Sequence, residues 1–116
     1  MAFKVVRSTQ FDYDLDFIHD HLIESYMGLG DAFSDAFERA ANRIEVIETD
    51  MEALARSPYQ GTLSPEIAPG LRHVTKNRAI FYFQVDEERQ IIMVLAVFFG
   101  GQDHGQRIVK RLARAT

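Results

Sequence analysis

Three cations and a tyrosine in the second half of the chain are the residues best suited to chemistry on a phosphate. They are Arg72, Lys76, Arg78 and Tyr82. Cations neutralise phosphate charge, and a lysine or a tyrosine can transfer a proton in acid–base catalysis. Because side chains alternate along a strand, Arg78 and Tyr82 are expected to share a face, with Arg72 approaching them from a neighbouring strand. The sequence allows two interpretations: a phosphate site, or cations solvating a sheet edge while Tyr82 packs in the core.

A second group of cations near the C-terminus has the spacing of one helical face. Arg107, Lys110, Arg111 and Arg114 stand at positions i, i+3, i+4 and i+7, which adjoin one another on a helix. Arginine and lysine clustered in this way can dock on an acidic protein surface or on phosphates. The alternative is that they complement the negative end of the helix dipole and stay solvated.

The histidines and glycines do not indicate a metal or a cofactor. His19 and His21 are two residues apart, so they point to different sides of a helix. His104 has the position of a helix-start residue, and Gly100 and Gly101 lack the lysine and further glycines of a phosphate-binding loop. The chain contains no cysteine, which removes thiolate ligands and cysteine nucleophiles. We therefore predict no metal, no cofactor and no catalytic histidine.

Length and charge limit the class of protein. The 116 residues fit one domain, predicted to span residues 1–116. Residues 1–57 hold 12 acids and 5 bases, whereas residues 58–116 hold 5 acids and 8 bases. The net charge of −4 opposes rapid, sequence-independent binding of nucleic acid. No apolar run approaches the roughly 20 residues of a membrane span, and no signal-peptide core is present, so we expect a cytoplasmic protein with no membrane partner.

The strongest structural pattern predicts a β-hairpin. Arg78–Val85 and Ile91–Phe99 are rich in β-branched and aromatic residues and flank the charged loop Asp86–Gln90. The second segment is apolar at every position, which predicts a central strand covered on both faces. Phe3–Arg7 and Leu71–Thr75 predict two further strands.

Two helices are predicted between the first strand and the proline-bearing connector of residues 57–70. The first begins at a cap on Thr9 and ends at Gly28; the second runs from a cap on Gly30 or Asp31 to Arg56. Each carries an apolar stripe: Phe11, Leu15, Ile18, Leu22 and Tyr26 on the first, and Phe33, Phe37, Ala40, Ile44, Ile47, Met51 and Leu54 on the second. The second stripe has heptad spacing, which predicts a helical hairpin, with a homodimeric coiled coil as the alternative.

A short C-terminal helix completes the pattern. Asp103 and Gln106 have the spacing of a capping box, and the predicted apolar side contains Ile108, Val109 and Leu112. Together the elements predict an α+β fold with the order β-α-α-β-β-β-α. In this fold an antiparallel sheet packs against an N-terminal two-helix hairpin.

This order, together with three local motifs, resembles the RelE/ParE superfamily of toxin–antitoxin toxins over nearly the whole chain. The motifs are Gly70-Leu71-Arg72 opening a strand, Arg78 to Tyr82 in the middle strand, and Ile92 to Asp103 at the end of the sheet. The resemblance implies a type II toxin–antitoxin module, with a role in plasmid stabilisation. It also implies a cognate antitoxin as partner in a hetero-oligomer, with Phe98 or Phe99 lining the groove that takes it.

Two activities are compatible with the resemblance. RelE-like members cut messenger RNA on the ribosome, and ParE-like members inhibit DNA gyrase by binding it. Where many members end the last strand with histidine and arginine, this chain has Phe99, Gly101 and Gln102, which neither transfer protons nor neutralise phosphate. We therefore expect a ParE-like toxin that binds gyrase through the basic C-terminal helix. The alternatives are a RelE-like ribonuclease using Arg72, Lys76, Arg78 and Tyr82, and a non-toxic relative that only binds antitoxin.

Overall fold

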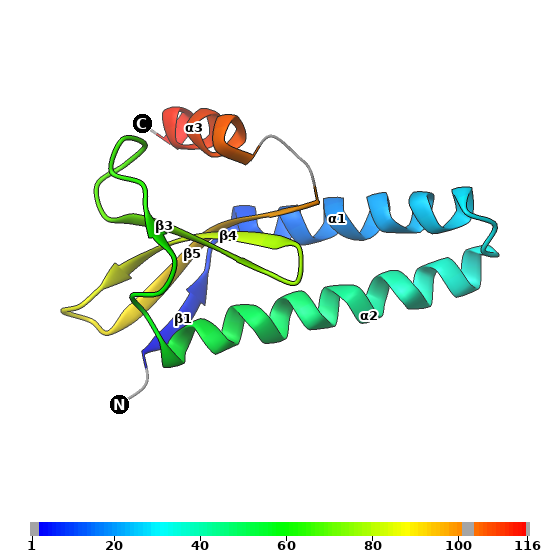
Figure 1. The fold of residues 1–116 in the computed structure, drawn as a ribbon, viewed down its shortest axis with the longest axis horizontal. Coiled ribbons are helices and arrows are strands. Elements are labelled where there is room, and N and C mark those ends of the chain that lie inside the picture. Colours follow the sequence, from blue (N-terminus) through cyan, green and yellow to red (C-terminus); the bar gives the residue numbers. More distant parts are fainter. Residues whose placement is uncertain (1–2, 101–103, 116) are drawn as a thin grey trace.

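The computed structural model describes residues 3–100 and 104–115, without the side chains of residues 114 and 115. It confirms the α+β class and the predicted order of elements (Figure 1). The elements are β1 Lys4–Arg7, α1 Thr9–Gly28, α2 Phe33–Glu52, a 3₁₀ turn Ala53–Arg56, β2 Thr62–Leu63, β3 Leu71–Lys76, β4 Ala79–Asp86, β5 Ile91–Phe99 and α3 His104–Ala115. The two-residue strand β2, inside the connector, is the element that the sequence pattern missed. No helix in the described ranges is long and apolar enough to cross a membrane.

The five strands form a mixed sheet in the order β1-β5-β4-β3-β2. Strands β2 to β5 pair antiparallel, as predicted, whereas β1 pairs parallel with β5. The parallel pairing is possible because two long helices, not a tight turn, separate β1 from the other strands. Strand β4 is the central one, and β5 lies between it and β1.

An extra residue in β5 shifts the alternation of its side chains between the two faces of the sheet. Tyr82 pairs with Ala96 but Phe83 pairs with Val94, so Leu95 is a bulge. The bulge reverses the alternation: Val94 and Val97 both belong to the core under the helices, while Ala96 belongs to the opposite face. The second half of β5 is therefore buried on both faces, as its composition predicts.

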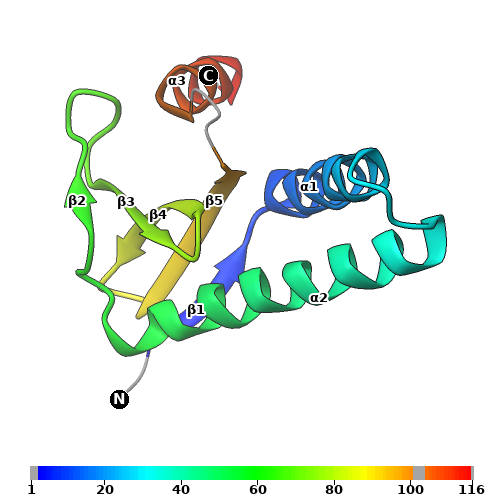
Figure 2. The same cartoon turned by 45° about the vertical axis from the view of Figure 1, so that its right-hand side comes forward.

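The larger core lies between the sheet and the α1–α2 hairpin (Figure 2). In this core the rings of Phe11 and Phe81 are stacked with centroids 6.5 Å apart. The predicted stripe of α1 is buried from Phe11 to Leu22, but Phe33 and Phe37 on α2 are exposed. The loop end of the hairpin extends beyond the sheet (Figure 1), and there the Phe37 ring contacts those of His19 and Phe33, with centroids 5.0 and 6.0 Å away.

The helix caps differ from the predicted ones by one or two residues. Ser8, not Thr9, caps α1, and its hydroxyl accepts a hydrogen bond from the amide of Phe11. Helix α2 begins after Ala32, with no side-chain cap from Asp31 or Gly30. The first prediction was wrong because Ser8 and Thr9 are adjacent cap-type residues and sequence alone does not choose between them. The second was wrong because the Asp31 carboxylate pairs with Arg39 at 2.6 Å and does not cap α2.

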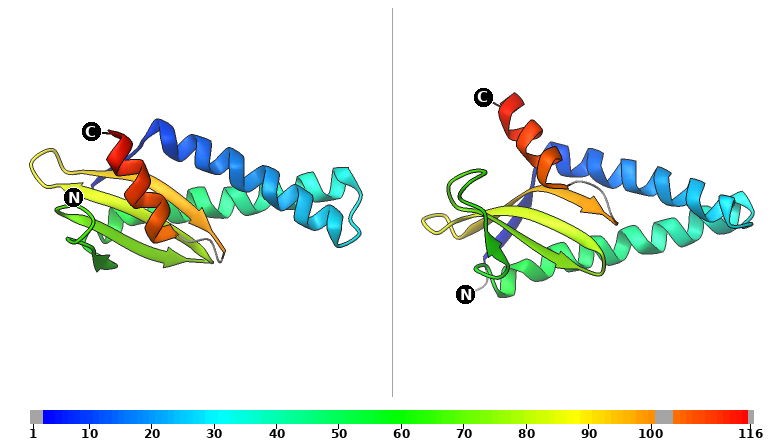
Figure 3. Two further views of the ribbon diagram at one scale, coloured as in Figure 1. Left: turned by 90° about the horizontal axis from the view of Figure 1, so that it is seen from above. Right: turned by 45° about the horizontal axis from the view of Figure 1, so that its top comes forward.

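Helix α3 lies on the opposite face of the sheet from the hairpin, which gives three layers (Figure 3). Ile108 is fully buried and Leu112 packs beside it, whereas Val109, expected on the apolar side, is 48% exposed. One helical face meets the sheet, and Val109 lies outside it. The predicted cap Asp103 lies outside the described residues.

Candidate functional site

The sheet separates the residues that were expected to form a phosphate site. Arg72 is paired with Phe83 and Lys76 with Ala79, and both pairs lie on the hairpin face. Tyr82 lies on the α3 face and is 1% exposed. The predicted set of three cations around a tyrosine hydroxyl is therefore not assembled.

Arg78 does not share a strand face with Tyr82, because it belongs to a turn and not to a strand. Asn77 and Arg78 have positive φ angles of 49° and 69°, as in a two-residue hairpin turn of type I′. The Arg78 guanidinium lies 5.9 Å from the ring centroid of Phe99. Arg72 donates a 2.7 Å hydrogen bond to the carbonyl of Tyr59. Both arginines thus have structural contacts.

The α3 face instead holds a cluster that the sequence did not indicate: His73, Tyr82 and His104, with Ser64 beside them. A 2.7 Å hydrogen bond joins the Tyr82 hydroxyl to Nδ1 of His104, and a 2.8 Å bond joins the Ser64 hydroxyl to Nδ1 of His73. The two imidazole centroids are 6.3 Å apart. Each ring is oriented through Nδ1, which leaves its Nε2 without a protein partner among the described residues.

Tyr82 is the titrating group of this cluster with a perturbed pKa. Burial, and secondarily the negative charge of Glu66, raise the pKa of the Tyr82 hydroxyl above its usual value. The folded state therefore disfavours the phenolate relative to the unfolded chain. This contribution to stability is fully present below about pH 10, the unfolded pKa, and is lost as the pH rises through the folded pKa.

Tyr82→Phe should abolish this alkaline sensitivity. At neutral pH it should cost about 1 kcal/mol, because the hydrogen bond to His104 is lost. Urea unfolding between pH 8 and pH 11 should show stability falling more steeply in the wild type than in Tyr82→Phe. Tyr13→Phe is the control, since Tyr13 is exposed; identical slopes for wild type and Tyr82→Phe would contradict the assignment.

An ion pair fixes α3 to α1 and to the edge of β5. Arg111 donates to both carboxylate oxygens of Asp14, at 2.7 and 2.8 Å, and to the carbonyl of Leu95 at 3.3 Å. Asp14 also accepts a 3.0 Å bond from the amide of Val97. Strand β1 ends opposite Val94, so these side chains satisfy the backbone of β5 where β1 no longer does.

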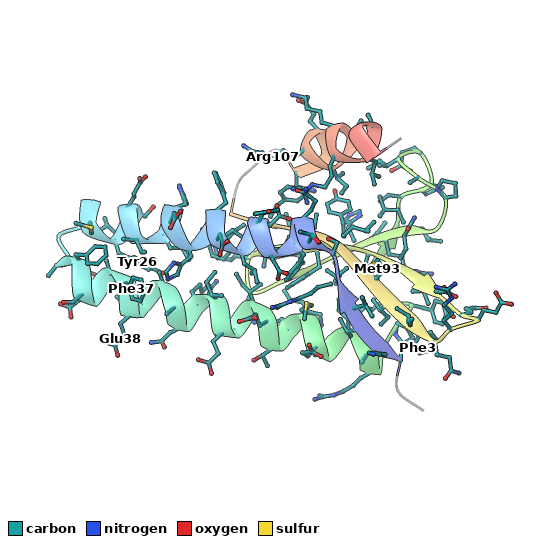
Figure 4. All side chains as sticks on the ribbon, turned by 180° about the vertical axis from the view of Figure 1, so that it is seen from behind. Phe3, Tyr26, Phe37, Glu38, Met93 and Arg107 are labelled. Atoms are coloured by element: carbon teal, nitrogen blue, oxygen red, sulfur yellow. The ribbon has the colours of Figure 1, made fainter. Side chains whose placement is uncertain are left out.

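A groove of about 590 Å³ lies beside this ion pair, between α1, α3 and the end of β5. Its lining is apolar and basic: Tyr13 and Phe17 are 62% and 55% exposed, and Arg107 and Lys110 lie opposite them on α3. Figure 4 shows Arg107 on the α3 side of the molecule. Exposed aromatics next to cations are typical of protein–protein contact surfaces.

Three solved structures have a similar fold. The chromosomal ParDE toxin–antitoxin system of P. aeruginosa matches with a TM-score of 0.63 and 23% identity, over 85% of this chain and 97% of that one. The RelBE2 toxin–antitoxin complex of Mycobacterium tuberculosis gives 0.58 and 17%, over 88% and 95%. A mutant of the E. coli toxin RelE in the free state gives 0.59 and 13%, over 96% and 98%. This chain has the RelE/ParE toxin fold. No protein-family model and no curated protein sequence matches it.

On the RelE/ParE fold of this chain, the four cations of the C-terminal helix are not equivalent. Arg111 is held by Asp14, whereas Arg107 and Lys110 face the groove; the side chain of Arg114 lies outside the described residues. The predicted basic face is therefore an ion-paired anchor with two available cations beside it. The predicted apolar stripe of α1 gave no sign that Tyr13 and Phe17, which lie outside that stripe, would complete the groove.

Phe98 and Phe99 lie on opposite faces of this RelE/ParE sheet, as alternation predicts. Phe98 packs beneath α3 and lines the groove, while Phe99 packs against the hairpin core. The guanidinium of Arg43 lies 5.1 Å from the Phe99 ring. Phe98 is only 4% exposed, so it offers little surface to a segment bound in the groove. In the described part of the chain, no three acidic or histidine side chains are grouped as metal ligands.

Proposed function

We propose that the chain is the toxin of a type II toxin–antitoxin module and acts in the ParE-like way, by binding and inhibiting DNA gyrase. The observation that carries this proposal is the groove between α1 and α3, an exposed surface that combines aromatic side chains with Arg107 and Lys110. Inhibition by binding requires such a surface and no proton-transfer residues. The separation of Tyr82 from Arg72, Lys76 and Arg78 favours binding over cleavage.

A cognate antitoxin is the second proposed partner. Two of the structures similar to this chain are toxin–antitoxin assemblies by their titles. An antitoxin segment in the groove would lie on Tyr13 and Phe17 and would cover Arg107 and Lys110. Antitoxin and target would then compete for one surface, so bound antitoxin would keep the toxin from its target.

Ribosome-dependent RNA cleavage is the second candidate function, and the histidine cluster supports it. Cleavage by a ribose 2′-hydroxyl needs a base for its proton and an acid for the departing 5′ oxygen. His73 and His104, each oriented through Nδ1, are groups of this kind and lie together on the α3 face, whereas the sheet separates the four residues expected from sequence.

His73→Gln tests this second candidate. If messenger RNA is cut on the ribosome, the substitution should lower the cleavage rate by about 10²- to 10⁴-fold, the usual contribution of a general acid or base. His21→Gln, on the exposed side of α1, is the control and should cleave like the wild type. Equal cleavage by both variants would remove His73 from the mechanism.

Expression without antitoxin distinguishes the candidate functions in cells. A gyrase inhibitor should induce the SOS response, and a ribonuclease should stop translation as messages are cut. Normal growth, together with tight antitoxin binding, would support a non-toxic relative and contradict both proposals.

A further inference from the structure

One exposed face of α1 has the residue spacing of a helix-pairing seam. Gln10, Tyr13, Phe17, Asp20, Glu24 and Met27 follow one another at intervals of 3, 4, 3, 4 and 3 residues, and all six are exposed. This is the spacing of heptad positions a and d. The stripe is distinct from the buried one of Phe11, Leu15, Ile18 and Leu22, which packs on the sheet. Helix α1 thus has a second stripe that no other part of the described chain covers.

The two halves of this stripe are chemically different. The N-terminal half carries Tyr13 and Phe17 and lies beside Arg107 and Lys110 of α3. The C-terminal half carries the acids Asp20 and Glu24. Figure 3 shows α3 close to the N-terminal part of α1 but not to its far end. The stripe is therefore aromatic at one end, where the cations of α3 lie beside it, and acidic towards the other end.

We infer that two copies of the chain associate through this stripe, with their α1 helices antiparallel. In an antiparallel pair each a position lies beside a d position of the other helix, so Gln10 meets Met27 of the second copy. By the same register Tyr13 meets Glu24 and Phe17 meets Asp20 of the second copy. A two-fold axis makes every contact twice and closes the assembly as a dimer.

Charge complementarity selects a second antiparallel copy as the occupant. Antiparallel pairing brings Arg107 and Lys110 of one copy toward Asp20 and Glu24 of the other. Glu24 forms none of the ion pairs found among the described residues. Parallel pairing would place the cations of both copies at the same end, where they repel.

The length of the contact sets the strength of the association. Residues 10 to 27 span about 26 Å at 1.5 Å per residue, which makes a small interface for a stable dimer. The association should therefore be weak, concentration-dependent and weakened by salt. It would also cover Tyr13, Phe17, Arg107 and Lys110, so that dimer formation and binding of any partner in the groove exclude each other. The inference does not require the proposed function.

Cysteine cross-linking tests the register, since the chain has no cysteine of its own. Gln10→Cys and Met27→Cys place thiols at the two ends of the seam without altering its aromatic or charged residues. Within one chain the two positions are about 26 Å apart, too far for a disulfide, which needs Cα atoms about 4.4 to 6.8 Å apart. A mixture of the two single variants should give a covalent dimer on mild oxidation, while Gln10→Cys mixed with Asp35→Cys, on α2, should not.

Charge exchange provides a second measurement that does not depend on thiols. Glu24→Lys and Lys110→Glu should each weaken the dimer about tenfold in sedimentation equilibrium, because each brings like charges together. The two changes in one chain should restore the association. A monomer at all concentrations, or a dimer without the Gln10–Met27 cross-link, would overturn the inference. Either result comes from the purified chain alone, so it is independent of any gyrase or ribosome assay.

Discussion

Replacing Asp14 by alanine should lower the free energy of unfolding by about 3 kcal/mol and release α3 from the sheet. The Asp14 side chain is 10% exposed and that of Arg111 23%. Without the carboxylate, Arg111 keeps a largely buried charge with no counter-ion, and the amide of Val97 loses its acceptor. Removing one partner of such a pair costs several kcal/mol because the other stays buried.

Urea unfolding gives the energy, and hydrogen exchange shows where the structure opens. Amides of α3 and of the end of β5 should lose protection in Asp14→Ala, while those of α2 keep it. Asp16→Ala is the matched control, since Asp16 is an exposed acid on the same helix. Equal stability of the two variants would show that the ion pair does not hold α3.

Reversing the two available cations should strongly weaken gyrase inhibition without unfolding the protein. Arg107→Glu with Lys110→Glu converts two attractive contacts with the target into repulsive ones. Reversing one such exposed contact should cost about 1 to 2 kcal/mol of binding free energy, so the two changes together should weaken inhibition about 100-fold. Arg111→Glu should also lose inhibition, but for a different reason: it places a second carboxylate beside Asp14 and destabilises the fold.

The matched control for this variant is Lys4→Glu with Arg89→Glu. It changes the net charge by the same amount, at two exposed positions that do not line the groove, one on β1 and one in the β4–β5 turn. Circular dichroism should show both double variants folded. Full inhibition by Arg107→Glu with Lys110→Glu would exclude the groove as the target-binding surface.

The fold could be read from the sequence because its elements have strong local signals. The stripes of α1 and α2, and the aliphatic and aromatic segments of β4 and β5, each have a period that belongs to one kind of element. The parallel pairing of β1 with β5 had no such signal, since it depends on where the helical hairpin returns the chain. The bulge at Leu95 was also unpredictable, because any residue of an all-apolar strand can take that position.

The site was harder to predict because single-residue shifts decide which face a side chain occupies. Placing Arg78 in a strand put it beside Tyr82, whereas the turn at Asn77 and Arg78 puts the two on different faces. The groove depends on contacts between residues that are far apart in the chain, such as Asp14 and Arg111. Arg107 and Lys110 were identified from their spacing; Tyr13 and Phe17 were not, because exposed aromatics resemble ordinary surface residues in sequence.

The most direct test of the central proposal is the supercoiling activity of purified DNA gyrase in the presence of this protein, measured beside cleavage of ribosome-bound message by the same preparation. We predict inhibited supercoiling and intact message, with inhibition lost in Arg107→Glu with Lys110→Glu and kept in Lys4→Glu with Arg89→Glu. Unaffected gyrase with cleaved message would contradict the proposal and favour the ribonuclease, with His73→Gln then testing the histidine cluster.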